Sequence, residues 1–120
     1  GRRLPNLPAA VRAVRALLGR GPQVVILSLG REGAVLGACG SPEVWVGQPP
    51  SVRSRSAVGA GDSLVGGVVR AWAKGAGLQE AFRWGLACGA ATAMAPGTEL
   101  CHRQDVERLL PRVRLRRVGG

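Results

Sequence analysis

The 120-residue sequence contains no tyrosine, a single histidine and only three cysteines, so several kinds of site have little to build on. Cys39, Cys88 and Cys101 are odd in number and share no Cys-x-x-Cys spacing, which supports neither a zinc site nor a disulfide framework. We expect buried or idle thiols, because free cysteine often packs as a small hydrophobic group. His102 has no visible partner for a Ser-His-Asp triad, and we expect it on the surface.

Long hydrophobic runs are also absent. The longest weakly polar run, Leu86 to Pro96, is well short of the roughly 20 residues that a membrane-spanning helix needs. No charged segment followed by an apolar one is visible after Gly1, so a signal peptide is not indicated. We therefore expect a cytoplasmic protein without a membrane partner. Its 120 residues, 46% of them hydrophobic, suffice for one domain or a part of one.

Acidic residues are scarce. The sequence has 7 Asp and Glu and 17 Lys and Arg, which gives a net charge of +10. Such a charge can indicate binding to nucleic acid. The basic residues gather near the two ends of the chain, and all except Lys74 are arginine. The aromatic residues that could stack on bases are Phe82, Trp45, Trp72 and Trp84. None of them lies in a basic stripe, so a nucleic-acid-binding module is the last of our alternatives.

The most informative stretch is Ala57-Val58-Gly59-Ala60-Gly61-Asp62-Ser63. One glycine on each side of a small residue, Ala60, permits a tight turn. The spacing of the apolar residues that follow predicts a helix over residues 62–74. A glycine turn that opens a helix directs unpaired N–H groups and the positive end of the helix dipole at one spot, which suits a phosphate. Asp62 would repel a resting phosphate there, so its presence indicates general-base chemistry.

The glycine-rich stretch differs from two well-known nucleotide motifs. No Lys-Ser or Lys-Thr follows the glycines, as a P-loop requires, and Leu64 occupies the place of the third glycine of a dinucleotide fingerprint. A simpler interpretation is a glycine turn in which Asp62 or Ser63 caps the helix. The spacing of the residues leaves both interpretations open.

Hydrophobic patterning over the rest of the chain predicts an α/β protein. The expected helices are 7–18 with Asn6 as its cap, 62–74, 78–95 and 102–110, and the expected strands are 23–29, 34–38 and 43–46. The strand at 23–29 is typical of one buried on both faces, but few other strands are available to flank it. Small residues after Phe82 would let a neighbouring helix or a flat ligand approach closely. We therefore expect one edge of an α/β sandwich, the C-terminal part of something larger.

Three segments, in this order, resemble the ribokinase-like, PfkB-type carbohydrate kinases. They are the loop 28–34 (Ser-Leu-Gly-Arg-Glu-Gly-Ala), the signature 58–67 (Val-Gly-Ala-Gly-Asp-Ser-Leu-Val-Gly-Gly) and the helix segment 87–93 (Ala-Cys-Gly-Ala-Ala-Thr-Ala). Within the family the likeness is closest to the 1-phosphofructokinases, with the tagatose-6-phosphate kinases next. The resemblance implies that residues 1–120 form the C-terminal part of a ribokinase-like three-layer α/β/α sandwich, without the sugar-binding part.

The resemblance also implies a function, the transfer of the γ-phosphoryl group of ATP to a hydroxyl of fructose 1-phosphate. Asp62 would take the proton from that hydroxyl. The backbone N–H groups of Gly59, Ala60 and Gly61 would form an anion hole for the phosphoryl group. The nucleotide would be held by Ser28, Leu29, Gly30, Arg31, Glu32, Gly33, Gly61, Asp62 and Gly89. Mg²⁺ would arrive with ATP, and no metal ligand from the protein is implied.

The sequence departs from the family pattern in three respects. Ala57 stands where the family usually has threonine, no Asn-x-x-Glu motif is present, and the sugar-binding half is missing. We therefore expect little or no kinase activity from this chain alone, although a full-length enzyme could form a homodimer. The alternatives are another sugar kinase of the family, such as a tagatose-6-phosphate kinase, and an inactive truncated relative that binds nucleotide or nothing.

Overall fold

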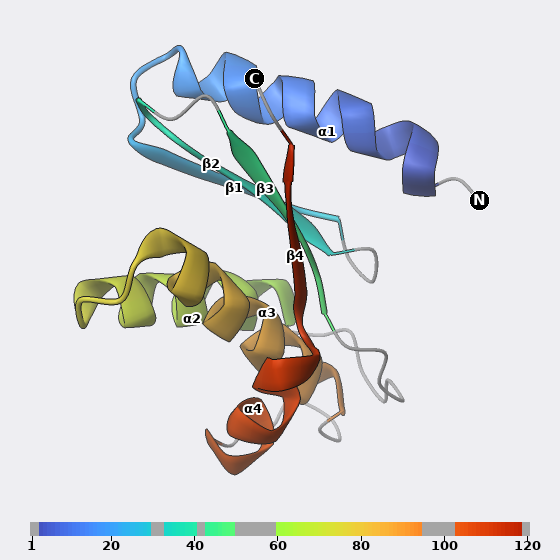
Figure 1. Cartoon of the computed structure of the whole chain (residues 1–120), viewed down its shortest axis with the longest axis vertical. Coiled ribbons are helices and arrows are strands. Elements are labelled where there is room, and N and C mark those ends of the chain that lie inside the picture. The colour runs from blue at the N-terminus through green and yellow to red at the C-terminus, as the bar shows by residue number, and fades with distance from the viewer. Residues whose placement is uncertain (1–2, 30–32, 41–42, 50–59, 95–102, 119–120) are drawn as a thin grey trace.

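The structure, a computed structural model, describes residues 3–29, 33–40, 43–49, 60–94 and 103–118. A four-stranded sheet separates one helix from three others, so the chain forms three layers (Figure 1). The elements are α1 (Arg3–Leu18), β1 (Val24–Ser28), β2 (Ala34–Ala38), β3 (Val44–Gln48), α2 (Ala60–Ala73), α3 (Leu78–Met94), α4 (Arg103–Leu109), the 3₁₀ turn η2 (Leu110–Arg112) and β4 (Arg114–Val118). The predicted α/β sandwich is confirmed.

Helix α1 begins at Arg3, four residues before the predicted start. Asn6 therefore lies inside the helix, and the prediction that it caps the helix was wrong. The prolines permit the longer helix, because Pro5 stands in the first turn, where N–H groups have no helical partner. Pro8, further along, removes one backbone hydrogen bond. The buried Val11 and Val14 then hold α1 on the sheet.

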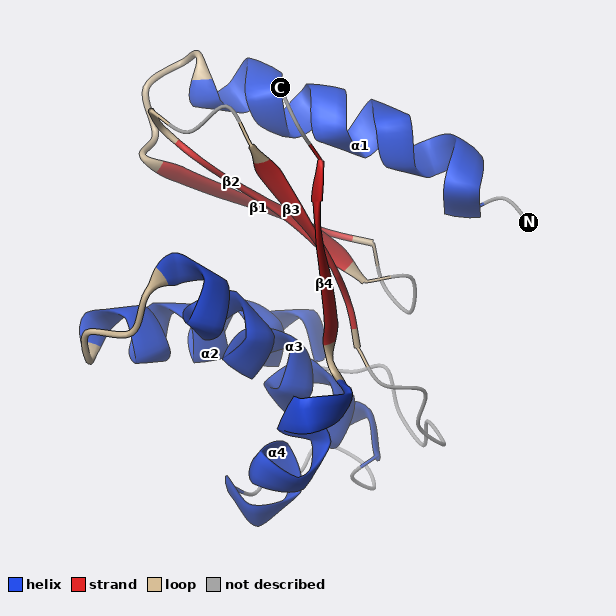
Figure 2. Ribbon diagram, in the orientation of Figure 1, coloured by secondary structure: helices blue, strands red, loops and turns tan. Residues whose placement is uncertain are grey.

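The sheet has the order β1-β2-β3-β4, and all three pairings are antiparallel (Figure 2). Successive side chains of a strand point to opposite faces, and each face of this sheet carries its own core. The core on the α1 side includes Val14, Val35, Val44 and Val46. The core on the side of α2, α3 and α4 includes Leu36, Leu64, Val68, Phe82 and Leu86. Both faces are therefore buried, as in a three-layer sandwich.

The two outer strands differ from what the sequence predicted. The segment 23–29 was expected as a strand buried on both faces, yet β1 is half-buried and pairs, within the described residues, with β2 alone. The strand β4 was not predicted, because Arg-Leu-Arg-Arg-Val lacks a clear apolar alternation. It forms by pairing with β3, and the guanidinium of Arg117 lies 5.5 Å from the centre of the Trp45 ring and 3.3 Å from the Glu43 carboxylate. A cross-strand contact thus supports β4 where local propensity does not.

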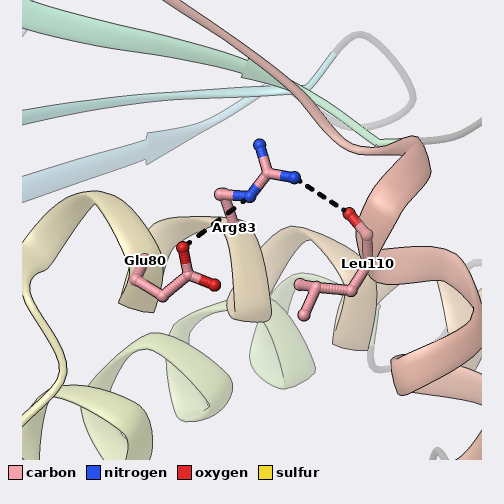
Figure 3. A network of polar contacts seen from close by, with 3 residues as sticks. All are labelled: Glu80, Arg83 and Leu110. Carbon is pink, nitrogen blue, oxygen red and sulfur yellow. Dashed lines mark hydrogen bonds and ion pairs between the residues drawn. The ribbon is translucent and has the colours of Figure 1, made fainter.

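Helix α3 also fixes the segment that leads into β4. The predicted helix 102–110 is α4 followed by η2, since Pro111 cannot continue an α-helical hydrogen-bond ladder. Figure 3 shows Arg83 of α3 between two partners, donating from Nη2 to the Leu110 carbonyl oxygen at 3.3 Å, with its Nε 3.9 Å from the Glu80 carboxylate. This contact ties η2 to α3.

Candidate functional site

The first turn of α2 contains most of the glycine-rich stretch that the sequence singled out. The helix begins at Ala60, two residues before the predicted start, so Asp62 and Ser63 lie inside it. The interpretation of either residue as the helix cap was therefore wrong. Gly61 has the negative φ of a helix rather than the positive φ of a tight turn. The first N–H groups of a helix have no partner within it, and they lie at the positive end of the helix dipole.

This first turn is open to solvent. Gly61 and Asp62 are exposed, and a Cβ placed on Gly61 would have no other heavy atom within 4 Å. Within the part of the chain that the structure describes, no side chain covers Gly61. Asp62, the third residue of the helix, lies in this same exposed turn. Gly59, the remaining glycine of the expected anion hole, lies outside the described residues.

The hairpin turn between β1 and β2 contains the expected nucleotide-side loop. Its middle residues, Gly30, Arg31 and Glu32, lie outside the described residues. Ser28 is exposed at the end of β1. Leu29 closes the turn by donating its N–H to the Gly33 carbonyl oxygen at 2.8 Å, and its side chain packs against the core on the α1 side. The side chain of Leu29 is therefore partly buried.

Gly33 is required here for a reason independent of any nucleotide. Its φ is +111°, and a Cβ at this position would lie 2.0 Å from the Gly47 carbonyl oxygen on β3. Side chains rarely adopt such a φ, and no side-chain rotation relieves a clash with backbone. The hairpin therefore needs glycine at position 33 whether or not a ligand binds.

The fold brings the two expected halves of the site to the same side of the molecule. In Figure 1 the end of β1, the start of β2 and the start of α2 all point to the side opposite the turn that joins α2 and α3. Gly89, also expected to hold the nucleotide, is partly exposed on α3, next to the buried Cys88. The strand ends and the helix terminus thus lie toward the same side of the molecule in this view.

The small residues of α3 serve mainly to pack helix on helix. A Cβ on Gly67 of α2 would lie 3.0 Å from the Gly85 Cα atom and 2.9 Å from the Cys88 sulfur. A Cβ on Gly85 would lie 2.5 Å from the Leu64 carbonyl oxygen. The sequence left open whether the small residues admit a neighbouring helix or a flat ligand. In this part of α3 they admit a neighbouring helix, α2.

One residue of this region was missed by the sequence reasoning. Thr92 of α3 is only 3% exposed, and its Oγ1 donates a hydrogen bond of 2.7 Å to Oγ of Ser63, the residue after Asp62. The signal available was a single hydroxyl in the small-residue run 87–93. Nothing in the spacing indicates which distant residue that hydroxyl meets.

The described residues offer little for a metal site or for a membrane-spanning helix. Among them, no three His, Cys, Asp or Glu side chains gather in a way that could hold a metal ion. No helix within those same ranges is both long and apolar enough to cross a membrane.

The architecture and the helix terminus define the class of protein. Phosphofructokinase-2 of Escherichia coli in complex with potassium superposes with a TM-score of 0.77 at 34% identity, over 84% of this chain and 32% of that one. The residue pattern of pfkB family carbohydrate kinases matches residues 2–105. The chain therefore belongs to the PfkB family of carbohydrate kinases, and the resemblance seen in the sequence is confirmed.

Curated relatives carry two phosphofructokinase names. The ATP-dependent 6-phosphofructokinase isozyme 2 of E. coli K12 is 42% identical over 85 residues, which are 71% of this chain and 27% of the relative. The 1-phosphofructokinase of Borreliella burgdorferi is 33% identical over 105 residues, 88% of this chain and 33% of the relative. The chain thus spans about a third or less of the length of these relatives.

Proposed function

We propose that this chain is the nucleotide-binding and catalytic C-terminal part of a phosphosugar kinase that transfers the γ-phosphoryl group of ATP to fructose 1-phosphate. The observation that carries the proposal is the exposed first turn of α2, with Asp62 in it and open space above Gly61. The relatives named above supply the class of substrate. A cytoplasmic location follows from the proposed use of ATP.

In this proposal the site works by charge and alignment. The N–H groups of Gly59, Ala60 and Gly61 would stabilise the transferring phosphoryl group, since phosphoryl transfer depends on positioning and electrostatic stabilisation. The carboxylate of Asp62 would accept the proton of the attacking sugar hydroxyl, a step typically worth about 10² to 10⁴ in rate. Residues 28–33 and Gly89 would hold the rest of the nucleotide. Mg²⁺, bound to the phosphates of ATP, would reduce the repulsion between them and the Asp62 carboxylate.

The two edges of the sheet support the proposal that a further part of the domain completes the site. The edge strand β4 carries Arg114, Arg116 and Arg117, and charged side chains protect an edge from pairing with another chain. The other edge strand, β1, is formed by Val24 to Ser28 and has no charged residue. An unprotected apolar edge is typical of a strand that has a second neighbour.

Helix α2 has an apolar stripe that no other described residue covers, which supports the same proposal. Val65, Val69 and Trp72 follow one another at helical spacing, and they are 44%, 56% and 42% exposed. Leu64 and Val68, on the adjoining face, are buried in the core under the sheet. We propose that the sugar-binding part of the kinase covers the stripe and pairs with β1, and that the chain alone has little or no kinase activity.

A second candidate substrate is fructose 6-phosphate. The 42% identity to the E. coli 6-phosphofructokinase isozyme 2 favours it. Rates with fructose 1-phosphate and fructose 6-phosphate, measured in a protein that carries the sugar-binding part, would separate the two candidates. Faster turnover of fructose 6-phosphate than of fructose 1-phosphate would overturn fructose 1-phosphate as the substrate. Robust ADP production by the 120-residue chain with ATP, Mg²⁺ and either sugar would contradict the need for that part.

Binding of Mg-ATP to the 120-residue chain, measured by isothermal titration calorimetry, tests the anion site. Gly61→Val places a branched side chain over the open first turn and should weaken binding by at least about tenfold, because the phosphate can no longer approach the N–H groups. Gly66→Val is the matched control, since Gly66 is an exposed glycine of the same helix with equally open surroundings. Equal affinities of the two variants would contradict the proposed site.

A further inference from the structure

The hydrogen bond between Thr92 and Ser63 connects two helix ends that are 29 residues apart in the sequence. Thr92 lies in the last turn of α3, and Ser63 lies in the first turn of α2 directly after Asp62. Thr92 is 3% exposed, so water has little access to its hydroxyl if the bond is lost, whereas Ser63 is half-buried. A buried hydroxyl without a partner is costly, which makes this contact a specific constraint on the two helices.

The placement of α2 on α3 is determined at a second point as well. Gly67 and Gly85 let the two helix backbones come so close that a Cβ on either glycine would meet atoms of the other helix at 3.0 Å or less. One close crossing fixes the distance between two helices but leaves the helices free to rotate about the point of contact. A hydrogen bond about one turn away, at the helix terminus, removes this freedom.

We propose that Thr92 is a positioning residue of the phosphoryl-transfer site. Its hydroxyl holds Ser63 and so fixes the direction of the Asp62 carboxylate and of the neighbouring first-turn N–H groups. The inference rests on the proposed function, because it concerns the same helix terminus. Thr92 itself is buried and touches neither ATP nor sugar; it acts through Ser63.

The variants distinguish the effect of the Thr92 hydroxyl from the effect of side-chain volume. Thr92→Val keeps the branched shape and removes the hydroxyl, whereas Thr92→Ser keeps the hydroxyl. Ser63→Ala removes the other partner of the bond. Loss of one hydrogen bond should weaken Mg-ATP binding about fivefold in Thr92→Val, and Thr92→Ser should bind like the wild type. Ser63→Ala combined with Thr92→Val should cost no more than either change alone, since both break the same bond.

The experiment measures the dissociation constant of Mg-ATP and the thermal midpoint of the 120-residue chain for each variant. Ala91→Gly is the control, because Ala91 is 2% exposed on the same helix and its change lowers stability without touching the Thr92–Ser63 bond. We expect Ala91→Gly to lower the midpoint and leave the dissociation constant unchanged. Amide shifts of Gly61 and Asp62 in nuclear magnetic resonance spectra should change in Thr92→Val and return in Thr92→Ser.

The outcomes distinguish this inference from the proposed function. Wild-type chain that binds no Mg-ATP would overturn the proposed function and, with it, the role of Thr92. Wild-type chain that binds Mg-ATP while Thr92→Val binds equally well, with unchanged Gly61 and Asp62 shifts, would overturn the positioning role alone. If Thr92→Val fails to fold, Ser63→Ala tests the same hydrogen bond with the same measurements. Ser63 is only half-buried, so its change disturbs folding less.

Discussion

Gly67 of α2 and Gly85 of α3 lie against each other, so close that a Cβ on Gly67 would be 3.0 Å from the Gly85 Cα atom. This contact explains why the chain places glycine inside two helices, where glycine is otherwise unfavourable. It brings the first turn of α2, with Asp62, within hydrogen-bond distance of the far end of α3. The glycine pair is thus a structural condition for the candidate site.

Gly85→Ala should lower the free energy of unfolding by about 1 to 3 kcal/mol, because the added Cβ would lie 2.5 Å from the Leu64 carbonyl oxygen and the helices must separate. Urea unfolding followed by circular dichroism measures the change. Gly66→Ala is the control on α2, since its Cβ meets nothing within 4 Å, and helix propensity predicts a gain of up to about 1 kcal/mol. Equal stability of the two variants would contradict the tight crossing.

Gly33→Ala should destabilise the chain even without nucleotide, because the new Cβ meets the Gly47 carbonyl oxygen in addition to the strain of a positive φ. Gly21→Ala separates the two causes, since Gly21 has a φ of +124° and open surroundings. We expect Gly33→Ala to cost at least about 1 kcal/mol more than Gly21→Ala in urea unfolding. Similar losses of stability in both variants would show that the contact with the Gly47 carbonyl oxygen has no effect.

Asp62→Asn should leave Mg-ATP binding intact or strengthen it slightly, because the exposed carboxylate no longer repels the phosphates. In a protein that carries the sugar-binding part, the same change should reduce kcat by about 10² to 10⁴. Calorimetry gives the affinity and an ADP-coupled assay gives kcat. Retained turnover would contradict the assignment of Asp62 as the base.

Val69→Asp should change the stability of the 120-residue chain by no more than about 0.5 kcal/mol, since Val69 is 56% exposed. In a protein that carries the sugar-binding part, the same charge would be buried in the proposed interface, and the thermal midpoint should fall by several degrees. Gln79→Asp, an exposed position on α3, serves as the control for added charge. A midpoint that stays the same in the longer protein would show that the α2 stripe remains uncovered there.

Much of the fold was predictable from local patterns. The strand Ala34–Ala38 has the predicted bounds, and helices α2 and α3 begin and end within two residues of the prediction. These segments are rich in apolar residues, and glycine or proline follows each of them within two residues. The start of α1 was missed because proline near a helix start permits more than one beginning. The strand β4 was missed because pairing with β3, rather than its own sequence, makes it extended.

The candidate site was predictable only in part. Motif spacing indicated Gly61 and Asp62, and the structure places both on an exposed helix terminus, although their catalytic roles stay predictions. Spacing could not indicate Thr92, because its partner Ser63 is brought to it only when α2 packs on α3. Contacts between residues far apart in the chain depend on this packing.

The family, most helical and extended segments and the run that holds Asp62 could be read from local sequence, because glycine, proline and apolar patterns act over a few residues. Three features depend on the folded chain as a whole: β1 and β4 lie at the edges of the described sheet, glycines bring α2 against α3, and Thr92 reaches Ser63. These features arise from burial and from hydrogen bonds between distant segments, which no local pattern specifies.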